Sequence, residues 1–171
     1  MSLLNTNQDP RFAVENPMNE GIYRIIPLAA VILGFAVVAF NYGALPETIP
    51  IHFNGRGEAD GFGSRLTLWF LPVMNLVIFY VLELTTKSSF KWFNYPVTIT
   101  EENAAAQHGI ALQLIAVMRL IITLMLSWLT YEIVITTQKG GGMLNLWILG
   151  GSIVVLFGAI IYYMMEANKA K

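Results

Sequence analysis

Four side chains that can bind a metal ion lie close together in one polar segment of the sequence: His52, Asn54, Glu58 and Asp60. Zinc is often bound by histidine together with carboxylates. The spacing matches no standard metal motif, however, and His52 and Asn54 can equally cap turns while Asp60 holds a turn before Gly61. We therefore treat His52, Glu58 and Asp60 as metal-ligand candidates only, and we predict no bound metal and no other cofactor.

The same segment has a third interpretation, as a loop that binds a peptide or a lipid headgroup. It is rich in glycine, and glycine permits tight turns that present backbone N–H groups to a ligand. From Thr48 to Asn54 apolar and polar residues alternate, which predicts a short extended piece with Ile49, Ile51 and Phe53 on one face. The candidate ligand-binding residues are His52, Asn54, Gly57, Glu58, Asp60, Gly61, Ser64 and Arg65.

Other catalytic and binding chemistry finds little support in the sequence. There is no Gly-x-Ser-x-Gly, no phosphate-binding P-loop, no His-Glu-x-x-His and no dinucleotide fingerprint. Without cysteine the chain has no disulfide, no thiolate nucleophile and no cysteine-ligated zinc. A net charge of −1 excludes a strongly basic nucleic-acid binder. We therefore favour a protein that is not an enzyme and does not bind nucleic acid.

The segments on either side of this glycine-rich loop, which must position it, are mostly apolar. The chain is 56% hydrophobic and 12% charged, whereas a soluble domain has about 25% charged residues. A membrane-spanning helix needs about 20 mostly apolar residues, and four stretches qualify: 22–42, 66–84, 112–135 and 144–165. We expect an all-α membrane protein with one domain over residues 21–171, a small ordered loop between spans one and two, and a mobile tail over residues 1–20.

The distribution of lysine and arginine predicts the orientation of these spans, because cytoplasmic loops carry an excess of both. One side of the membrane has six such residues: Arg11, Arg24, Lys87, Lys91, Lys169 and Lys171. The other side has three: Arg56, Arg65 and Lys139. We therefore expect both termini in the cytoplasm and the glycine-rich loop outside.

Two charged residues of the spans lie on the predicted inner side. A charge inside the membrane is costly, about 2.5–3.5 kcal/mol at a helix centre on insertion scales. Arg119 can reach the headgroups by extending its side chain along the helix. Alternatively it can pair with Glu83, which ends the second span on the same side. Both interpretations remain open at this stage.

Two further polar residues lie elsewhere in the spans. Asn75, near the middle of the second span, should face other helices and form hydrogen bonds there. Glu132 lies near the outer end of the third span, where it can be hydrated or pair with Arg56 or Arg65. A transport pathway would need a longer chain of such groups than the sequence provides.

Gly150, Gly151 and Gly158 lie in the fourth span. Gly150 and Gly158 are eight residues apart and so share one helix face. Small residues allow close helix approach, which indicates packing either inside the bundle or in a homo-oligomer.

The loop before the third span has a helix-start pattern. Thr98 and Glu101 have the spacing of a capping box, and Thr100 is a competing N-cap. The third helix is therefore expected to begin in water near Glu101 and to continue into the membrane.

The glycine-rich loop also carries a resemblance to a known family. The motif Leu45-Pro46-x-x-Ile49-Pro50-x-His52-Phe53-Asn54-x-x-Gly57-x-x-Asp60-Gly61-x-Gly63-Ser64-Arg65 resembles the signature loop of a bacterial membrane domain of unknown function. That domain also forms the front part of the SdpI-type immunity proteins against a secreted killing factor. The segment Asn94-Tyr95-Pro96-x-x-Ile99-Thr100-x-Glu102-Asn103 is similar to the domain's second patterned segment.

The resemblance implies a location in the bacterial inner membrane and a role in immunity or signalling, through binding of a peptide or lipid headgroup. The immunity proteins continue with further spans, whereas this chain has four. The alternatives are a metal-dependent membrane enzyme that uses the outer-loop histidine and carboxylates, and a small transporter or accessory subunit. The expected partners are the lipid bilayer, a peptide or membrane protein, and a second copy of the chain.

Overall fold

The computed structural model describes Val14 and residues 21–88 and 90–171. Four helices long and apolar enough to cross a membrane account for most of this part of the chain: Ile22–Ala44, Arg65–Thr85, Ala104–Gln138 and Leu146–Lys169. The expected class of four membrane helices with a small ordered loop between the first two is confirmed. The mobile tail expected over residues 1–20 lies, apart from Val14, outside the described residues.

Within these spans the regular α-helices are α1 (Ile22–Asn41), α2 (Phe70–Thr85), α3 (Ala104–Gln138) and α4 (Leu146–Lys169). Short 3₁₀-helices extend two of them, with Tyr42–Ala44 following α1 and Arg65–Trp69 preceding α2. Another 3₁₀-helix, Phe90–Trp92, lies in the connection between α2 and α3.

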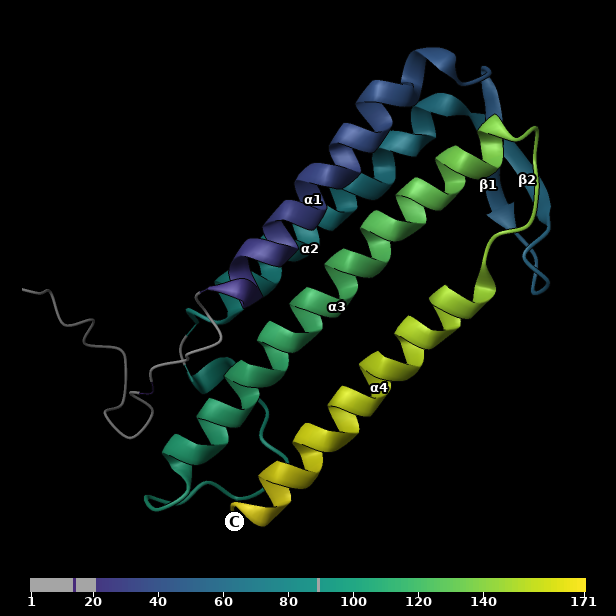
Figure 1. The fold of residues 1–171 in the computed structure, drawn as a ribbon. Helices are drawn as coiled ribbons and strands as arrows, with labels where there is room; N and C mark the ends of the chain where they lie inside the picture. Colours follow the sequence, from purple (N-terminus) through teal and green to yellow (C-terminus); the bar gives the residue numbers. More distant parts are fainter. Residues whose placement is uncertain (1–13, 15–20, 89) are drawn as a thin grey trace, which may run out of the picture.

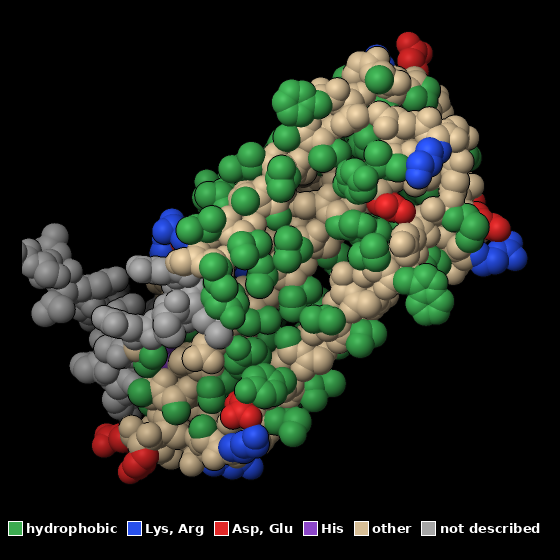
Figure 2. Space-filling view, viewed as in Figure 1, with side chains coloured by type: hydrophobic (Ala, Val, Ile, Leu, Met, Phe, Trp, Pro, Cys, Tyr) green, Lys and Arg blue, Asp and Glu red, His purple; other side chains and the backbone are tan. Residues whose placement is uncertain are grey.

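The long helix α3 is the centre of the bundle. It packs against α1, α2 and α4, while α4 packs chiefly against α3 (Figure 1). At 35 residues α3 is about 52 Å long, and it therefore exceeds the roughly 30 Å hydrocarbon core of a bilayer. Apolar side chains cover the visible faces of the helices, and charged side chains gather toward the two ends of the molecule (Figure 2). A surface of this kind suits a lipid environment.

The third helix begins near the expected place, with a different cap. Asn103 Oδ1 accepts from the Thr100 N–H at 2.8 Å, and Thr100 Oγ1 accepts from the Asn103 N–H at 3.3 Å. This reciprocal pair satisfies two backbone donors before α3 starts at Ala104. The reciprocal contact thus joins Thr100 and Asn103, not Thr98 and Glu101, and Asn103 is the N-cap residue of α3.

The ordered loop is a β-hairpin of strands β1 (Thr48–Phe53) and β2 (Ala59–Ser64), which pair antiparallel. It lies across the ends of α1, α2 and α3, and we call this the hairpin end of the molecule (Figure 1). The opposite end, where α1 begins and α2 ends, is called the loop end. An apolar core joins the hairpin to the helices and contains Val38, Leu45, Ile49, Leu68, Ile133, Val134 and Leu144.

The alternation expected along Thr48–Asn54 fails at Ile51, whereas His52 is exposed and Phe53 packs against the apolar core, as expected. The register shifts between Pro50 and His52, so Ile51 has no direct partner on β2. A bulge of this kind adds a residue to one strand and turns the next side chains. As a result Ile49 is 1% exposed, whereas Ile51 is 51% exposed. The two isoleucines therefore do not share a buried face.

Candidate functional site

The tip of the hairpin is a turn built around Asn54. Its Oδ1 accepts from the backbone N–H groups of Arg56 at 2.8 Å and Glu58 at 3.1 Å. Its Nδ2 donates to Glu58 Oε2 at 2.8 Å, and Arg56 Nε donates to the same oxygen at 3.1 Å. Asn54 and Glu58 therefore shape the turn, as asparagine does when its side chain bonds to its own backbone two residues on.

Gly57 attaches this turn to the connection between α3 and α4. Its carbonyl oxygen accepts from the Leu144 N–H at 2.8 Å, and Glu58 forms an isolated bridge with Met143. The φ angle of Gly57 is +84°, and a Cβ there would lie 2.6 Å from the Leu144 carbonyl oxygen. Only glycine fits both the positive φ and the close approach.

His52 and Asp60 form the exposed polar pair of the hairpin. His52 Nδ1 and Asp60 Oδ1 are in hydrogen-bond contact, and their side chains are 71% and 43% exposed. Gly61 pairs with His52 across the strands, and a Cβ on Gly61 would lie 2.8 Å from His52 Cβ. The glycine thus leaves room for the imidazole on the neighbouring strand. Both side chains are therefore accessible to a ligand.

Arg65 and Ser64 hold the base of the hairpin. Arg65 Nη1 donates to the Leu45 carbonyl oxygen at 2.8 Å, and its guanidinium lies 4.9 Å from the centre of the Tyr42 ring. Ser64 Oγ accepts from the Leu66 N–H at 3.2 Å and so caps the 3₁₀-helix before α2. Both side chains fix where the hairpin meets the helices.

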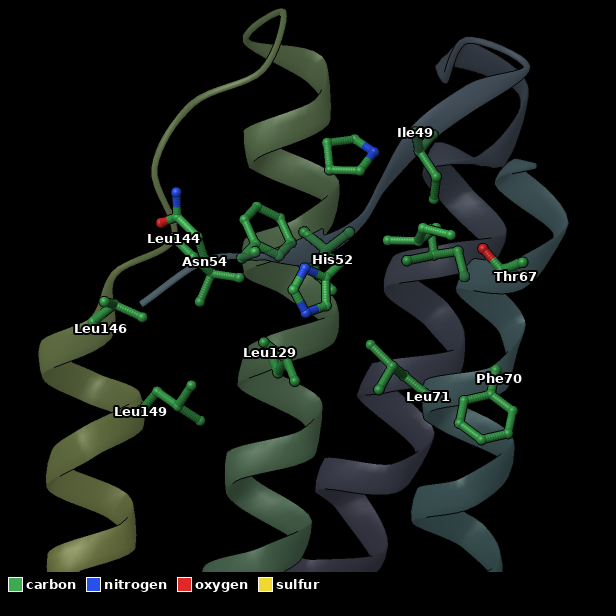
Figure 3. Close-up of a pocket in the computed structure, with 15 residues that line it drawn as sticks. Ile49, His52, Asn54, Thr67, Phe70, Leu71, Leu129, Leu144, Leu146 and Leu149 are labelled. Carbon is green, nitrogen blue, oxygen red and sulfur yellow. The ribbon is translucent and has the colours of Figure 1, made fainter. Parts of the chain in front are cut away.

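An apolar cavity of about 790 Å³ lies under the hairpin (Figure 3). Its walls come from β1, from the start of α2, from α3 and from α4. The labelled lining residues are Ile49, His52, Asn54, Thr67, Phe70, Leu71, Leu129, Leu144, Leu146 and Leu149. Cavities that hold small ligands have volumes of about 300–1,000 Å³ and mainly apolar walls with a few polar groups. The cavity therefore has the size and lining of a ligand site.

The three metal-ligand candidates do not converge. His52 contacts Asp60, whereas Glu58 contacts Asn54 and Arg56 within the turn. Within the described ranges, no three His, Asp or Glu side chains lie close enough together to hold a metal ion. The geometry therefore favours a hydrogen-bonding role for His52 and Asp60 over a metal centre.

Glu83 and Arg119 meet inside the bundle at the loop end. Arg119 Nη1 donates to Glu83 Oε2, and Arg119 Nη2 donates to the Tyr23 carbonyl oxygen at 3.0 Å. Arg119 is 0% exposed and Glu83 is 6% exposed. Arg119 therefore pairs with Glu83 instead of extending to the headgroups. The pair ties α2 and α3 to the beginning of α1.

Asn75 faces the other helices, as its place in the second span suggested. Its Nδ2 donates to the Thr123 carbonyl oxygen at 3.1 Å and to Ser127 Oγ at 2.9 Å. Ser127 Oγ in turn donates to the Ala30 carbonyl oxygen at 2.6 Å. A chain of hydrogen bonds thus joins α2, α3 and α1 deep within the bundle.

Glu132 has a different partner from the arginines considered above. Its Oε1 accepts from the Asn145 N–H at 3.2 Å, just before α4 begins. Arg65 is engaged with backbone carbonyls and Arg56 with Glu58. Glu132 therefore helps to fix the start of α4.

The glycines of α4 do not pack inside the bundle. A Cβ at Gly150, Gly151 or Gly158 would have nothing within 4 Å. Of the two alternatives, packing inside the bundle is therefore not what the structure shows, because α4 turns these residues away from α3. Packing against a second copy stays a prediction.

Two contacts at the loop end were not anticipated from the sequence. Gln107 Nε2 donates to the carbonyl oxygens of Ala167 at 2.7 Å and Ala170 at 3.0 Å, which holds the end of α4 against α3. The Tyr95 hydroxyl lies 2.9 Å from His108 Nδ1, and burial raises the pKa of Tyr95 to about 12. These pairs are 13 or more residues apart, so local spacing carries no signal for them.

Comparison with known proteins places the most recognisable part of the chain at the hairpin. The family model "Domain of unknown function (DUF1648)" matches residues 29–76, which cover most of α1, the hairpin and the first part of α2. This confirms a resemblance to a domain of unknown function over that segment. The segment around Asn94–Asn103 lies outside the match.

A relative from Archaeoglobus fulgidus, named "Uncharacterized protein", is 39% identical to this chain over 70 residues. The aligned part is 40% of this chain and 38% of the relative, so the similarity covers well under half of either protein. No solved structure matches this chain. Fold and comparisons together define a multi-pass membrane protein with a segment similar to this domain of unknown function.

Proposed function

We propose that the protein binds an amphipathic ligand at its hairpin end and is not an enzyme. The observation that carries this proposal is the cavity of about 790 Å³ under β1. The apolar part of a ligand fits among Leu71, Leu129 and Leu149 in the walls. Its polar part meets His52, which lines the cavity, and Asp60, which is in hydrogen-bond contact with His52.

The remaining candidate residues have a supporting role in this proposal. Asn54 and Glu58 shape the turn, Gly57 attaches it to the α3–α4 connection, and Gly61 leaves room for His52. A rigid frame of this kind lowers the entropy lost on binding, because the polar groups are already positioned. The hairpin therefore covers the cavity as a preformed structural element.

The ligand is a peptide or the headgroup and chain of a lipid. The resemblance to SdpI-type immunity proteins supports a peptide and a role in immunity or signalling, with the hairpin outside the cell and both termini in the cytoplasm of a bacterium. The excess of lysine and arginine at the loop end supports that orientation. A metal-dependent enzyme is less favoured, since Glu58 is held away from His52 and Asp60.

Survival of sensitive cells tests the peptide form of the proposal. Cells that express the wild type are exposed to a secreted killing peptide, and their survival is compared with that of the His52→Ala/Asp60→Ala double variant. The proposal expects protection by the wild type and its loss in the double variant, with equal amounts of both proteins in the membrane. If the wild type gives no protection, immunity is excluded as the role, and a lipid is then the ligand that the proposal retains.

A further inference from the structure

One buried carboxylate at the loop end is shared by three cations from different parts of the chain. Glu83 Oε2 accepts from Arg119, while Glu83 Oε1 lies 3.2 Å from Lys87 Nζ and 3.6 Å from Arg24 Nε. Arg24 comes from α1, Arg119 from α3, and Lys87 follows the end of α2. The cluster therefore joins three of the four spans.

The charges of this cluster do not balance. One carboxylate faces three cations, which leaves two excess positive charges among the described residues. Arg119 is fully buried, so its charge is compensated by Glu83 inside the bundle. The side chains of Arg24 and Lys87 are 55% and 59% exposed, and they therefore carry the excess on the outer face of the cluster.

The position of Arg24 and Lys87 matches the depth of phospholipid headgroups. Arg24 is the third residue of the span that begins at Ile22, and Lys87 lies two residues beyond the span that ends at Thr85. Arg24 also lies in the first turn of α1. A helix N-terminus favours negative charge, and the effect adds to that of the two cations.

We propose that Arg24 and Lys87 bind the phosphate of an anionic phospholipid at the loop end. Arg24 contacts Glu83 through Nε, so its two terminal nitrogens can donate to phosphate oxygens. The Lys87 ammonium group adds a second, compact positive charge beside the phosphate. Glu83 holds both side chains in place, and the buried Arg119 in turn fixes Glu83. This site is separate from the cavity at the hairpin end and does not depend on the proposed function.

The test counts phospholipids retained by the purified full-length protein. Native mass spectrometry compares protein from vesicles of phosphatidylcholine with protein from vesicles that also contain phosphatidylglycerol. The variant Arg24→Gln/Lys87→Gln removes the two exposed cations, and Arg56→Gln/Lys139→Gln removes two cations toward the hairpin end as a matched control. Because each surface cation contributes about 1 kcal/mol, we expect roughly fivefold weaker retention for each one removed from the site.

The outcomes separate the alternatives. Loss of phosphatidylglycerol in the Arg24/Lys87 variant, with retention in the control, supports the site. Equal losses in both variants show a general charge effect and overturn it, as does unchanged retention in both. In a separate experiment, inorganic phosphate is added to the protein in neutral detergent. If millimolar phosphate displaces the bound phosphatidylglycerol, free phosphate is the ligand and the lipid assignment is overturned. If the double variant folds poorly, Lys87→Gln with rescue by Lys87→Arg provides the same comparison.

Discussion

The backbone N–H of Leu144 donates to the carbonyl oxygen of Gly57 at 2.8 Å, which fastens the tip of the hairpin to the α3–α4 connection. Two segments far apart in the sequence are thereby joined above the cavity. Leu144 is itself buried and forms part of the cavity wall. The hydrogen bond therefore links the position of the hairpin to the shape of the proposed ligand site.

The substitution Gly57→Ala should open this attachment. The new Cβ would lie 2.6 Å from the Leu144 carbonyl oxygen, and the φ of +84° is strained for alanine. Strain of this kind costs about 1–3 kcal/mol. We expect a corresponding loss of stability in denaturant unfolding of the detergent-solubilised protein. Gly55→Ala is the matched control, since a Cβ there meets nothing within 4 Å. Equal stabilities of the two variants would contradict the role given to Gly57.

Replacement of Glu83 by Gln should destabilise the protein more than replacement of Arg119 by Gln. Glu83→Gln leaves three cations without a carboxylate, and one of them is fully buried. Breaking a buried ion pair by removing one partner costs about 3–5 kcal/mol. Arg119→Gln leaves Glu83 with Arg24 and Lys87 still beside it.

The double variant Glu83→Gln/Arg119→Gln provides the control for this comparison. It should recover part of the stability lost in Glu83→Gln, because the buried unpaired charge is gone. Unfolding of all three variants in detergent measures the coupling. Strictly additive losses would show that Glu83 and Arg119 do not stabilise each other.

Stability at alkaline pH should depend on Tyr95. Burial raises its pKa to about 12 in the folded protein, above the ordinary value of 10.0. Between these two values the folded state binds more protons than the unfolded state, so stability falls as pH rises from 10 toward 12. In Tyr95→Phe this contribution is absent, and the thermal unfolding midpoint should fall less steeply over that range. From pH 7 to 9 the thermal unfolding midpoints of the two proteins should change with pH by the same amount. Parallel curves up to pH 12 would contradict the effect of burial on Tyr95.

Single cysteines can establish the orientation, since the natural chain has none. Cysteine in place of Ser64, at the exposed base of the hairpin, should react with an impermeant reagent on intact cells. Cysteine in place of Ser88, beyond the end of α2, should react only after the membrane is permeabilised. The reverse pattern would place the hairpin in the cytoplasm and remove the proposed encounter with an external peptide.

Features that depend on local composition were predictable from the sequence. Long apolar runs located the four spans, and the polar character of Asn75 in the middle of one run predicted its contacts with other helices. The opposite charges of Glu83 and Arg119 near the same membrane edge made a pair one of two alternatives, and the structure shows the pair. These inferences need only hydropathy and helix length.

Features that depend on register and long-range packing were not predictable. The bulge near Ile51 exposes a side chain that the alternation would bury, and no residue type in β1 predicts it. Gln107 holds the end of α4 through carbonyl groups 60 and 63 residues away. The open face at Gly150 follows from the rotation of α4 against α3, which composition does not specify. The cavity itself arises only when β1, α2, α3 and α4 come together.

The most direct test of the account is whether an apolar chain enters the cavity under the hairpin. Protein in phosphatidylcholine vesicles is irradiated with a fatty alcohol that carries a diazirine group, and labelled peptides are mapped. We predict labels on the walls near Leu129 and Leu149, and their loss in Leu129→Trp, which fills the cavity. Leu124→Trp, on the exposed face of the same helix, should keep them. Labelling of the cavity walls that is unchanged in Leu129→Trp, or absent from the wild type, would contradict the account.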